Sequence, residues 1–347
     1  MIATSTNLQE MNRALLCPLC KSTLTQQSHT VLSCSNAACQ RHWEIKNGIP
    51  DFLPEDLPET LAMTEDSAVD SPIDHAHTAE LETDFHKNFK KKSVLRDLYV
   101  DYAFGIRQEI LANYAQALGR KLDILDIGSG ALLSGKAEQG GRHFNILKTY
   151  SRSYKAIEPS WSMIDQVNVP DSNLYHLSAA LLVRGVGESL PFPPQSCDVV
   201  FFLSMLDHVI NPEQVLREAQ SVLRPGGIVV ISLQNYQSWQ RRLARSVLSR
   251  YMHQREEQDH HNWRFTPATI LQLLNDTHYV NANCTELNYL TFPRLQPLEN
   301  FWFTLPQRLL GKTASLNLIR WIDRHLAQWF PGCGGTFVVY AYRKPAP

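Results

Sequence analysis

The sequence predicts an α/β protein built on a doubly wound, mostly parallel sheet, with a small cysteine-rich module in front of it. Beyond about residue 120, short apolar runs alternate with helical stretches, a pattern typical of strands buried between two layers of helices. Two close pairs of cysteines lie within residues 17–39, and a polar stretch separates them from the alternating region. The 347 residues suffice for one α/β domain and one small module.

Composition and charge limit the function only loosely. Apolar residues make up 44% of the chain, charged residues 19%, and the formal net charge is -1. A packed core is therefore expected, and the whole-chain charge gives no reason to expect nucleic acid or an anionic membrane as partner. No run approaches the roughly 18 to 20 apolar residues of a membrane span, and residues 1–13 lack the apolar core of a signal peptide. We expect a cytoplasmic protein without a transmembrane segment, for which peripheral membrane contact stays open.

The chain divides into three predicted parts: a cysteine module at 1–54, a polar linker at 55–83 and the main domain at 84–347. Runs typical of buried parallel strands lie at 122–127, 154–158, 181–186, 198–203 and 228–233. Two later strands are expected at 279–290 and 336–343. Helices are expected within 81–118, 236–253 and 267–276, and two apolar helices between 298 and 330.

The cysteine pairs have the spacing of a zinc ribbon. Cys17 and Cys20 form the first pair, Cys34 and Cys39 the second, and 13 residues separate the pairs. Each pair fits a tight turn, so four thiolates can converge on one zinc ion as a structural site without an open position. His42 as the fourth ligand and a disulfide pair are the alternatives. The polar surroundings of a short strand at 31–33 predict little apolar core, so metal would supply much of the folding free energy.

Two features after the first predicted strands suggest a nucleotide-type site. Asp126, Gly128, Ser129 and Gly130 follow the first strand, where glycines let backbone amides approach a ligand. Taken alone, this segment could equally be a plain tight turn. Glu158 ends the next strand, where a carboxylate can accept two hydrogen bonds from a ribose diol.

Three further motifs follow at defined spacing: Glu188-Ser189-Leu190-Pro191-Phe192, Ser204-Met205-Leu206-Asp207-His208-Val209 and Leu223-Arg224-Pro225-Gly226-Gly227. In this order, the set resembles class I S-adenosylmethionine-dependent methyltransferases, especially the group that includes the ubiquinone and menaquinone C-methyltransferases. The resemblance covers residues 122–233 closely and the later elements loosely. It implies a Rossmann-like domain and transfer of a methyl group from S-adenosylmethionine.

The resemblance also assigns expected roles to residues. It places Asp126, Gly128 and Gly130 at the methionine part of the cofactor, Glu158 at the ribose, and Glu188, Ser189 and Leu190 at the adenine. The segment from Ser204 to His208 would border the methyl group and the substrate. Further cofactor contacts are expected from Ser129, Pro159, Ser160 and Leu203. Two positions depart from the family pattern: Leu132 replaces its third glycine, and Val186 replaces an aspartate that reads the adenine amino group.

A base is needed only if the acceptor must lose a proton, and histidine can take that role. The catalytic candidates are therefore histidines. His208 follows the fourth strand, with Asp207 beside it, and His261 lies in a later loop after His260. A loop-orienting role for His208 and a solvated loop for the later pair are the alternatives.

The acceptor is expected to be a small molecule or lipid-like. The aromatic insertion at 293–330 is predicted to be a helical lid on the substrate pocket, or, if its apolar face is exposed, to rest on a membrane or a lipidic substrate. The arginine-rich segment 241–250 could meet phosphate or anionic lipid, or be a solvated helix face. An RNA methyltransferase is the first alternative function, because the cysteine module also resembles modules fused to enzymes that modify a guanine of ribosomal RNA. A non-catalytic cofactor-binding module is the second.

Overall fold

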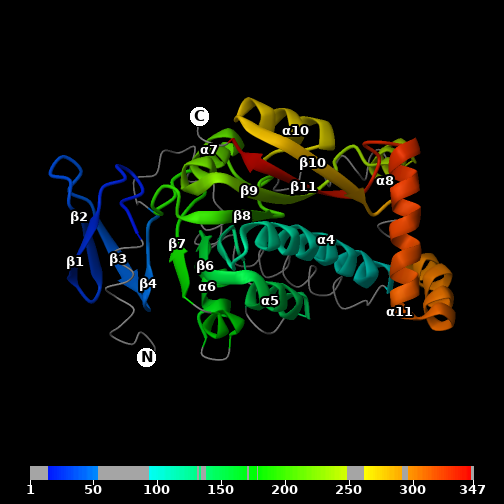
Figure 1. The fold of residues 1–347 in the computed structure, drawn as a ribbon, viewed down its shortest axis with the longest axis horizontal. Coiled ribbons are helices and arrows are strands. Elements are labelled where there is room, and N and C mark those ends of the chain that lie inside the picture. Colours follow the sequence, from blue (N-terminus) through cyan, green and yellow to red (C-terminus); the bar gives the residue numbers. More distant parts are fainter. Residues whose placement is uncertain are drawn as a thin grey trace.

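The computed structural model describes residues 15–53, 94–130, 133, 138–169, 172–177, 179–247, 262–290 and 296–344. They form a small four-stranded sheet near the N-terminus and a seven-stranded sheet with helices on both faces (Figure 1). The predicted Rossmann-like α/β class is confirmed. None of the described helices is both long and apolar enough to span a bilayer.

The small sheet is an antiparallel meander. Its strands are β1 (Leu24–Ser28), β2 (Val31–Cys34), β3 (His42–Lys46) and β4 (Ile49–Pro50), paired in chain order. Between β3 and β4, Asn47 and Gly48 have φ of 52° and 80°. A two-residue hairpin turn favours positive φ at both positions, which Asn-Gly adopts readily. The sequence analysis predicted β2 and not its neighbours.

The main sheet has the order β10-β11-β9-β8-β5-β6-β7. Its strands are β5 (Leu122–Ile127), β6 (Ser151–Glu158), β7 (Ala180–Arg184), β8 (Cys197–Leu203), β9 (Leu223–Gln234), β10 (Tyr279–Leu287) and β11 (Thr336–Arg343). From β7 to β9 the neighbours are parallel, whereas β11 is antiparallel to both β9 and β10. The chain leaves β5 for β6 and β7 on one side and returns to β8 on the other. In doubly wound sheets, ligands bind at the carboxyl edge of such a reversal.

The described helices are α4 (Val94–Leu118), α5 (Glu138–Tyr150), α6 (Trp161–Val167), α7 (Pro212–Val222), α8 (Trp239–Val247), α10 (Pro267–Asp276) and α11 (Gln296–Trp329), with a short 3-10 helix η1 (Asn173–His176). Local sequence defines several ends. Asn211 caps α7 by accepting a hydrogen bond from the Gln214 N–H at 3.0 Å. Gly311, with φ of 77° and ψ of 167°, divides α11 into the two predicted helices.

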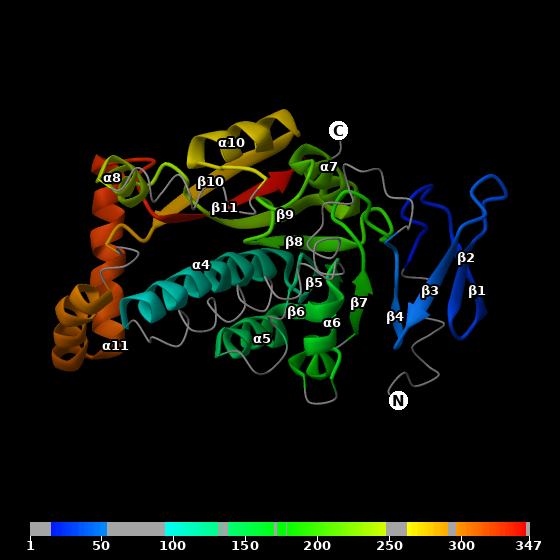
Figure 2. The same ribbon diagram turned by 180° about the vertical axis from the view of Figure 1, so that it is seen from behind.

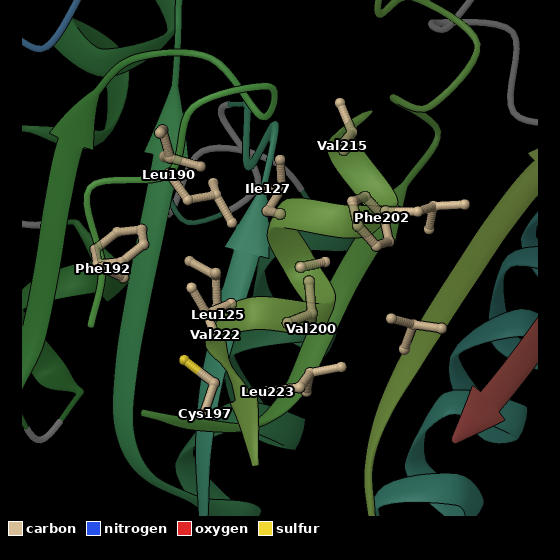
Figure 3. Close-up of a cluster of buried hydrophobic side chains, with 14 of the residues drawn as sticks. Leu125, Ile127, Leu190, Phe192, Cys197, Val200, Phe202, Val215, Val222 and Leu223 are labelled. Carbon is tan, nitrogen blue, oxygen red and sulfur yellow. The ribbon is translucent and has the colours of Figure 1, made fainter. Parts of the chain in front are cut away.

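Alternate residues of the central strands point into two cores. Ile124 and Phe201 face α4, α5 and α6, whereas Leu125 and Val200 face α7 and α10. Figure 3 shows the second core, where Val215 and Val222 of α7 cover the side chains of β5 and β8. β8 is buried at every position, which explains why its residues from Val199 to Leu203 are apolar on both faces.

The second core continues into the cysteine module. Leu32, Trp43 and Phe52 of the module belong to the same buried cluster as Leu190 and Phe192 of the main domain. Figures 1 and 2 both show the small sheet at the β7 edge. The expectation of a module with little apolar core was therefore wrong, because the main domain completes that core.

Element boundaries differ from the predictions by a few residues. The sixth strand begins at Ser151 instead of 154, and β10 ends at Leu287 instead of 290. The proposed linker 55–83, Leu132, His260 and His261 all lie outside the described residues.

Candidate functional site

The candidate site lies at the carboxyl edge of the sheet, where β5 turns at the glycine bend, residues 128–130. Gly128 and Gly130 have φ of 66° and 51°, and the Gly128 N–H donates to the Ile157 carbonyl of β6 at 2.8 Å. A Cβ at Gly128 would lie 2.8 Å from the Cβ of Met205, which follows β8. Both the backbone angle and the close contact therefore require glycine here.

Glu158, at the end of β6, is held against this bend. Its side chain is buried, and Oε2 accepts the Gly130 N–H at 2.8 Å while Oε1 accepts the Ser160 N–H at 3.1 Å. The Arg184 guanidinium donates from Nε to the Pro159 carbonyl at 2.8 Å, which ties the tip of β6 to β7. The structure thus brings together the glycine bend and the acidic strand end that the sequence singled out.

Asp126 lies below the bend, fully buried. Its Oδ2 accepts hydrogen bonds from the Tyr154 hydroxyl at 3.0 Å and from His143 Nε2 at 3.1 Å. Burial and the charge of Asp126 raise the pKa of Tyr154, so the phenol remains a donor. Within the described part of the chain, Oδ1 of Asp126 has no hydrogen-bond partner.

Arg107 is a buried cation near this carboxylate that the sequence analysis missed. It projects from α4, is 8% exposed, and donates from Nη2 to Ser232 Oγ at 3.1 Å at the end of β9. Burial lowers its pKa to about 10 against the opposing effect of Asp126, so it stays charged at neutral pH. Its Nε has no partner among the described residues. In the sequence, Arg107 lies at helical spacing between the apolar Phe104 and Leu111, and this pattern could have indicated a buried arginine.

The tip of β8 carries a strained residue. Ser204 is exposed, has φ of 57°, and donates its N–H to the Ser232 carbonyl at 2.8 Å. Left-handed geometry is unfavourable for a residue other than glycine, and such strain is concentrated at ligand sites. Leu203, just before it, is buried. The strained backbone makes this tip part of the candidate site, and its expected place beside the substrate stays a prediction.

The loop after β8 positions His208. Its side chain is 34% exposed, and Nε2 lies 4.0 Å from Asp207 Oδ1. A later segment secures the loop, because Asn262 Nδ2 donates to the His208 carbonyl at 2.7 Å and the Trp263 N–H donates to the Asp207 carbonyl at 3.0 Å. His261 directly precedes this segment but lies outside the described residues.

Glu188 binds the backbone of the same loop. Its Oε1 accepts the Ile210 N–H at 3.1 Å and the Asn211 N–H at 3.4 Å. Burial raises the pKa of Glu188, although these hydrogen bonds oppose that rise. Val186, the departure from the family's aspartate, is buried and offers no polar side chain.

Ser189 and Leu190 face the cysteine module. Ser189 Oγ donates to the Pro18 carbonyl at 2.7 Å, and the Leu190 side chain is fully buried in the shared core. Both side chains contact the docked module in this arrangement, and their expected role at the adenine stays a prediction. The sequence analysis did not anticipate this contact.

The cysteine turn binds the main domain closely. Lys21 Nζ donates to the Leu190 carbonyl at 3.0 Å and pairs with Glu218 of α7 at 2.6 Å. At the other end of the module, Asp51 pairs with Arg184 of β7 at 3.0 Å. The module is therefore fixed beside the candidate site at two points.

The four cysteines form one cluster. Their Sγ atoms all lie within 4.8 Å of one another, with Cys20 and Cys34 at 3.3 Å and Cys17 and Cys39 at 3.8 Å. Tetrahedral zinc with Zn–S of about 2.3 Å separates its sulfurs by about 3.8 Å, so the four thiols fit a metal. They are unpaired as disulfides. The alternative ligand His42 instead places Nδ1 2.7 Å from Ser33 Oγ.

The sheet order, the glycine bend and the acidic tip of β6 together define a Rossmann-like domain with a nucleotide-type site. Residues 137–231 match the family model described as a methyltransferase domain. The match begins after the glycine bend and includes Glu158, Glu188 and the loop with His208. The middle of the chain is thus similar in sequence to a methyltransferase domain.

Two curated relatives agree with this assignment. The chain is 26% identical over 148 residues to a malonyl-acyl-carrier-protein O-methyltransferase of Marinomonas sp. (strain MWYL1), covering 42% of this chain and 50% of that protein. It is 37% identical over 70 residues to an uncharacterized methyltransferase of Mycolicibacterium vanbaalenii, covering 18% of this chain and 28% of that protein. The chain therefore spans half or less of the length of these relatives.

Solved structures are similar at low identity. One is a methyltransferase, possibly acting on histamine, from Thermotoga maritima, with 13% identity, a TM-score of 0.41, and coverage of 71% of this chain and 91% of that chain. Another is phosphoethanolamine N-methyltransferase 2 of Haemonchus contortus with S-adenosyl-L-methionine, with 16% identity, a TM-score of 0.39, and coverage of 65% and 49%.

Proposed function

We propose that the chain transfers a methyl group from S-adenosylmethionine to a small-molecule or lipid-like acceptor. The observation that carries this proposal is the Glu158 carboxylate, fixed against the glycine bend at the reversal of the sheet order. Its two oxygens accept hydrogen bonds only, so they suit a diol that donates two. The backbone N–H groups that orient it, from Gly130 and Ser160, hold it ready for a ribose.

The polar atoms beneath the bend fit the amino-acid end of the same cofactor. Asp126 Oδ1 and Arg107 Nε are both buried and without partners in the described structure. An unsatisfied buried polar atom costs about 1–3 kcal/mol, so a ligand that satisfies both is favoured. Asp126 suits an ammonium group and Arg107 a carboxylate, which together match a zwitterionic amino acid.

When bound, the cofactor supplies an electrophilic methyl group on its sulfonium. The chain must then orient the acceptor and exclude water. Leu203 and Met205 close the β8 side of the bend with apolar surface, and Ser204 offers its exposed hydroxyl to an acceptor. His208, partly exposed beside Asp207, is proposed to accept a proton from an acceptor that must lose one. The role of His261 stays a prediction.

We also propose that the four cysteines hold one structural zinc ion. Four protein ligands leave no position for substrate, so this metal orders the turn and takes no part in the reaction. Because Lys21 of that turn contacts Leu190 and Glu218, the metal would hold the module against the main domain.

A lipid-like or acyl acceptor is supported by the relative named as acting on malonyl-acyl-carrier protein, although it shares only half its length with this chain. The named relatives give the RNA alternative no support, and the cysteine turn, which that alternative assigns to RNA, contacts the main domain. Only a measurement of methyl transfer distinguishes the non-catalytic alternative from the proposed enzyme.

Methyl transfer can be measured with S-adenosylmethionine labelled in its methyl group. The full chain is incubated with cell extract, and label is counted separately in the lipid, small-molecule and RNA fractions. We expect label in the lipid or small-molecule fraction, lost with Glu158→Gln and kept with Glu44→Gln, a matched change at an exposed position of β3. Label in RNA alone, or in no fraction, would refute the proposal.

A further inference from the structure

The second half of α11 exposes large apolar side chains to solvent. Trp321 is 60% exposed, Trp329 71% and Phe330 55%, and Leu318 is also exposed. Leu318, Trp321 and Trp329 lie three and eight residues apart, so they share one stripe of the helix. A soluble protein seldom exposes such an aromatic surface without a use for it.

This stripe is not needed to hold the helix in place. Ser315, Ile319 and Asp323 are buried at four-residue intervals on a neighbouring side of the helix. Asp323 accepts hydrogen bonds from the Tyr99 hydroxyl of α4 at 3.0 Å and from the Asn288 N–H after β10 at 2.9 Å. The helix is therefore anchored by its inner side, and its outer apolar stripe is left fixed and uncovered by the described chain.

Arginines lie beside the aromatic stripe. The first residue of α8, Trp239, donates its N–H to the Cys333 carbonyl at 3.1 Å, just after α11, and Figures 1 and 2 both show α8 at this end of α11. This helix carries Arg241, Arg242 and Arg245, and α11 adds the exposed Arg324. Among the described side chains of α8 and residues 309–330, Asp323 is the one carboxylate, and it is fully buried.

We propose that this face, formed by α8 and residues 318–330, docks on a bilayer surface that contains anionic lipids. Tryptophan and phenylalanine insert at the boundary between headgroups and acyl chains, while arginines bind the lipid phosphates. The docking is peripheral, because none of the described helices can span the membrane.

The charge of the face argues against a second copy as its occupant. In a two-fold dimer the same patch would meet itself, so Arg242 and Arg324 would face their own copies, and the one carboxylate of the described face, Asp323, is buried. An anionic lipid surface supplies the opposite charge. The inference stands on this surface alone and not on the proposed methyl transfer, because docking requires no cofactor.

Vesicle co-sedimentation of the full chain tests the inference. The vesicles are phosphatidylcholine alone, or an equal mixture of phosphatidylcholine and phosphatidylglycerol. We expect binding to the mixed vesicles, weakened by added salt, with a blue shift of tryptophan emission. Arg242→Gln and Arg324→Gln should each weaken binding about fivefold, the effect of one basic residue near an anionic surface. The double variant Trp321→Ser, Trp329→Ser should abolish the emission shift.

Matched controls separate the face from general effects. Leu118→Ser and Arg217→Gln remove an exposed leucine and an exposed arginine from α4 and α7, away from this face, and should bind like the unaltered chain. Circular dichroism checks that every variant is folded. Absence of binding to mixed vesicles would overturn the inference, as would binding that the face variants leave unchanged. A dimer in sedimentation equilibrium that the double tryptophan variant abolishes would also overturn it, in favour of a second copy.

Discussion

The shared core predicts that the cysteine module and the main domain unfold together. Phe52 tests this, because it is 2% exposed, its ring lies 5.5 Å from that of Trp43, and its N–H donates to the Arg184 carbonyl of β7 at 2.9 Å. Phe52→Ala keeps that backbone bond and removes only the ring. Truncating a core phenylalanine costs about 3–5 kcal/mol, and we expect the lower part of this range because the site lies at the edge of the core.

Urea unfolding followed by circular dichroism and by tryptophan fluorescence measures the effect. We expect a single transition in both signals, with the free energy of unfolding lowered by about 3 kcal/mol. Leu19→Ala is the control, because Leu19 is an exposed residue of the same module and should change stability by no more than about 0.5 kcal/mol. An early transition confined to the variant's module, with the main transition unchanged, would show that the core is not shared.

Three further predictions concern the metal, acid stability and the glycine bend. Cys20→Ser should lose bound zinc, measured by metal analysis, and chelation of the unaltered chain should lower stability similarly; unchanged zinc content would refute the cluster as the site. Burial raises the pKa of Asp123, but hydrogen bonds from Arg152 and Ser153 outweigh burial and lower this pKa from 3.8 to about 2. Its stabilisation is therefore present above pH 3.8 and lost as the pH falls through about 2; Asp123→Asn should remove about 2 kcal/mol of stability at neutral pH and flatten this acid dependence. Gly128→Ala should destabilise the fold by at least about 1–2 kcal/mol in urea unfolding, because the left-handed backbone is unfavourable and Met205 must move; an unchanged free energy would contradict the close contact.

Buried strands of the main sheet were the most predictable elements. Leu122–Ile127 and Thr336–Arg343 were predicted with their observed bounds, because buried strands are short segments rich in apolar residues that local sequence reveals. The small strands β1, β3 and β4 were missed. Leu24 of β1 and Trp43 of β3 are buried in one cluster with the distant Leu190 and Phe192, which no local pattern of the module reports.

The part of the candidate site formed by the end of one strand and the turn after its neighbour was predictable from the sequence. Glu158 and the glycine bend follow neighbouring parallel strands, so their proximity follows from the sheet. The direction of the Ser189 side chain was not predictable, because the carbonyl to which it donates a hydrogen bond belongs to Pro18, 171 residues away in the chain. Arg107 was missed for the same reason, since its partner Ser232 lies on another element 125 residues later.

Calorimetric titration of the full chain with S-adenosylmethionine shows whether Glu158 and the glycine bend bind this cofactor. We expect binding to the unaltered chain and to Glu44→Gln, and binding weakened about 10- to 100-fold in Glu158→Gln, since a hydrogen bond to a charged group is worth about 1.5–3 kcal/mol. Urea unfolding of Glu158→Gln confirms that the variant is folded. Absence of binding to the unaltered chain, or equal affinity in Glu158→Gln, would refute this site.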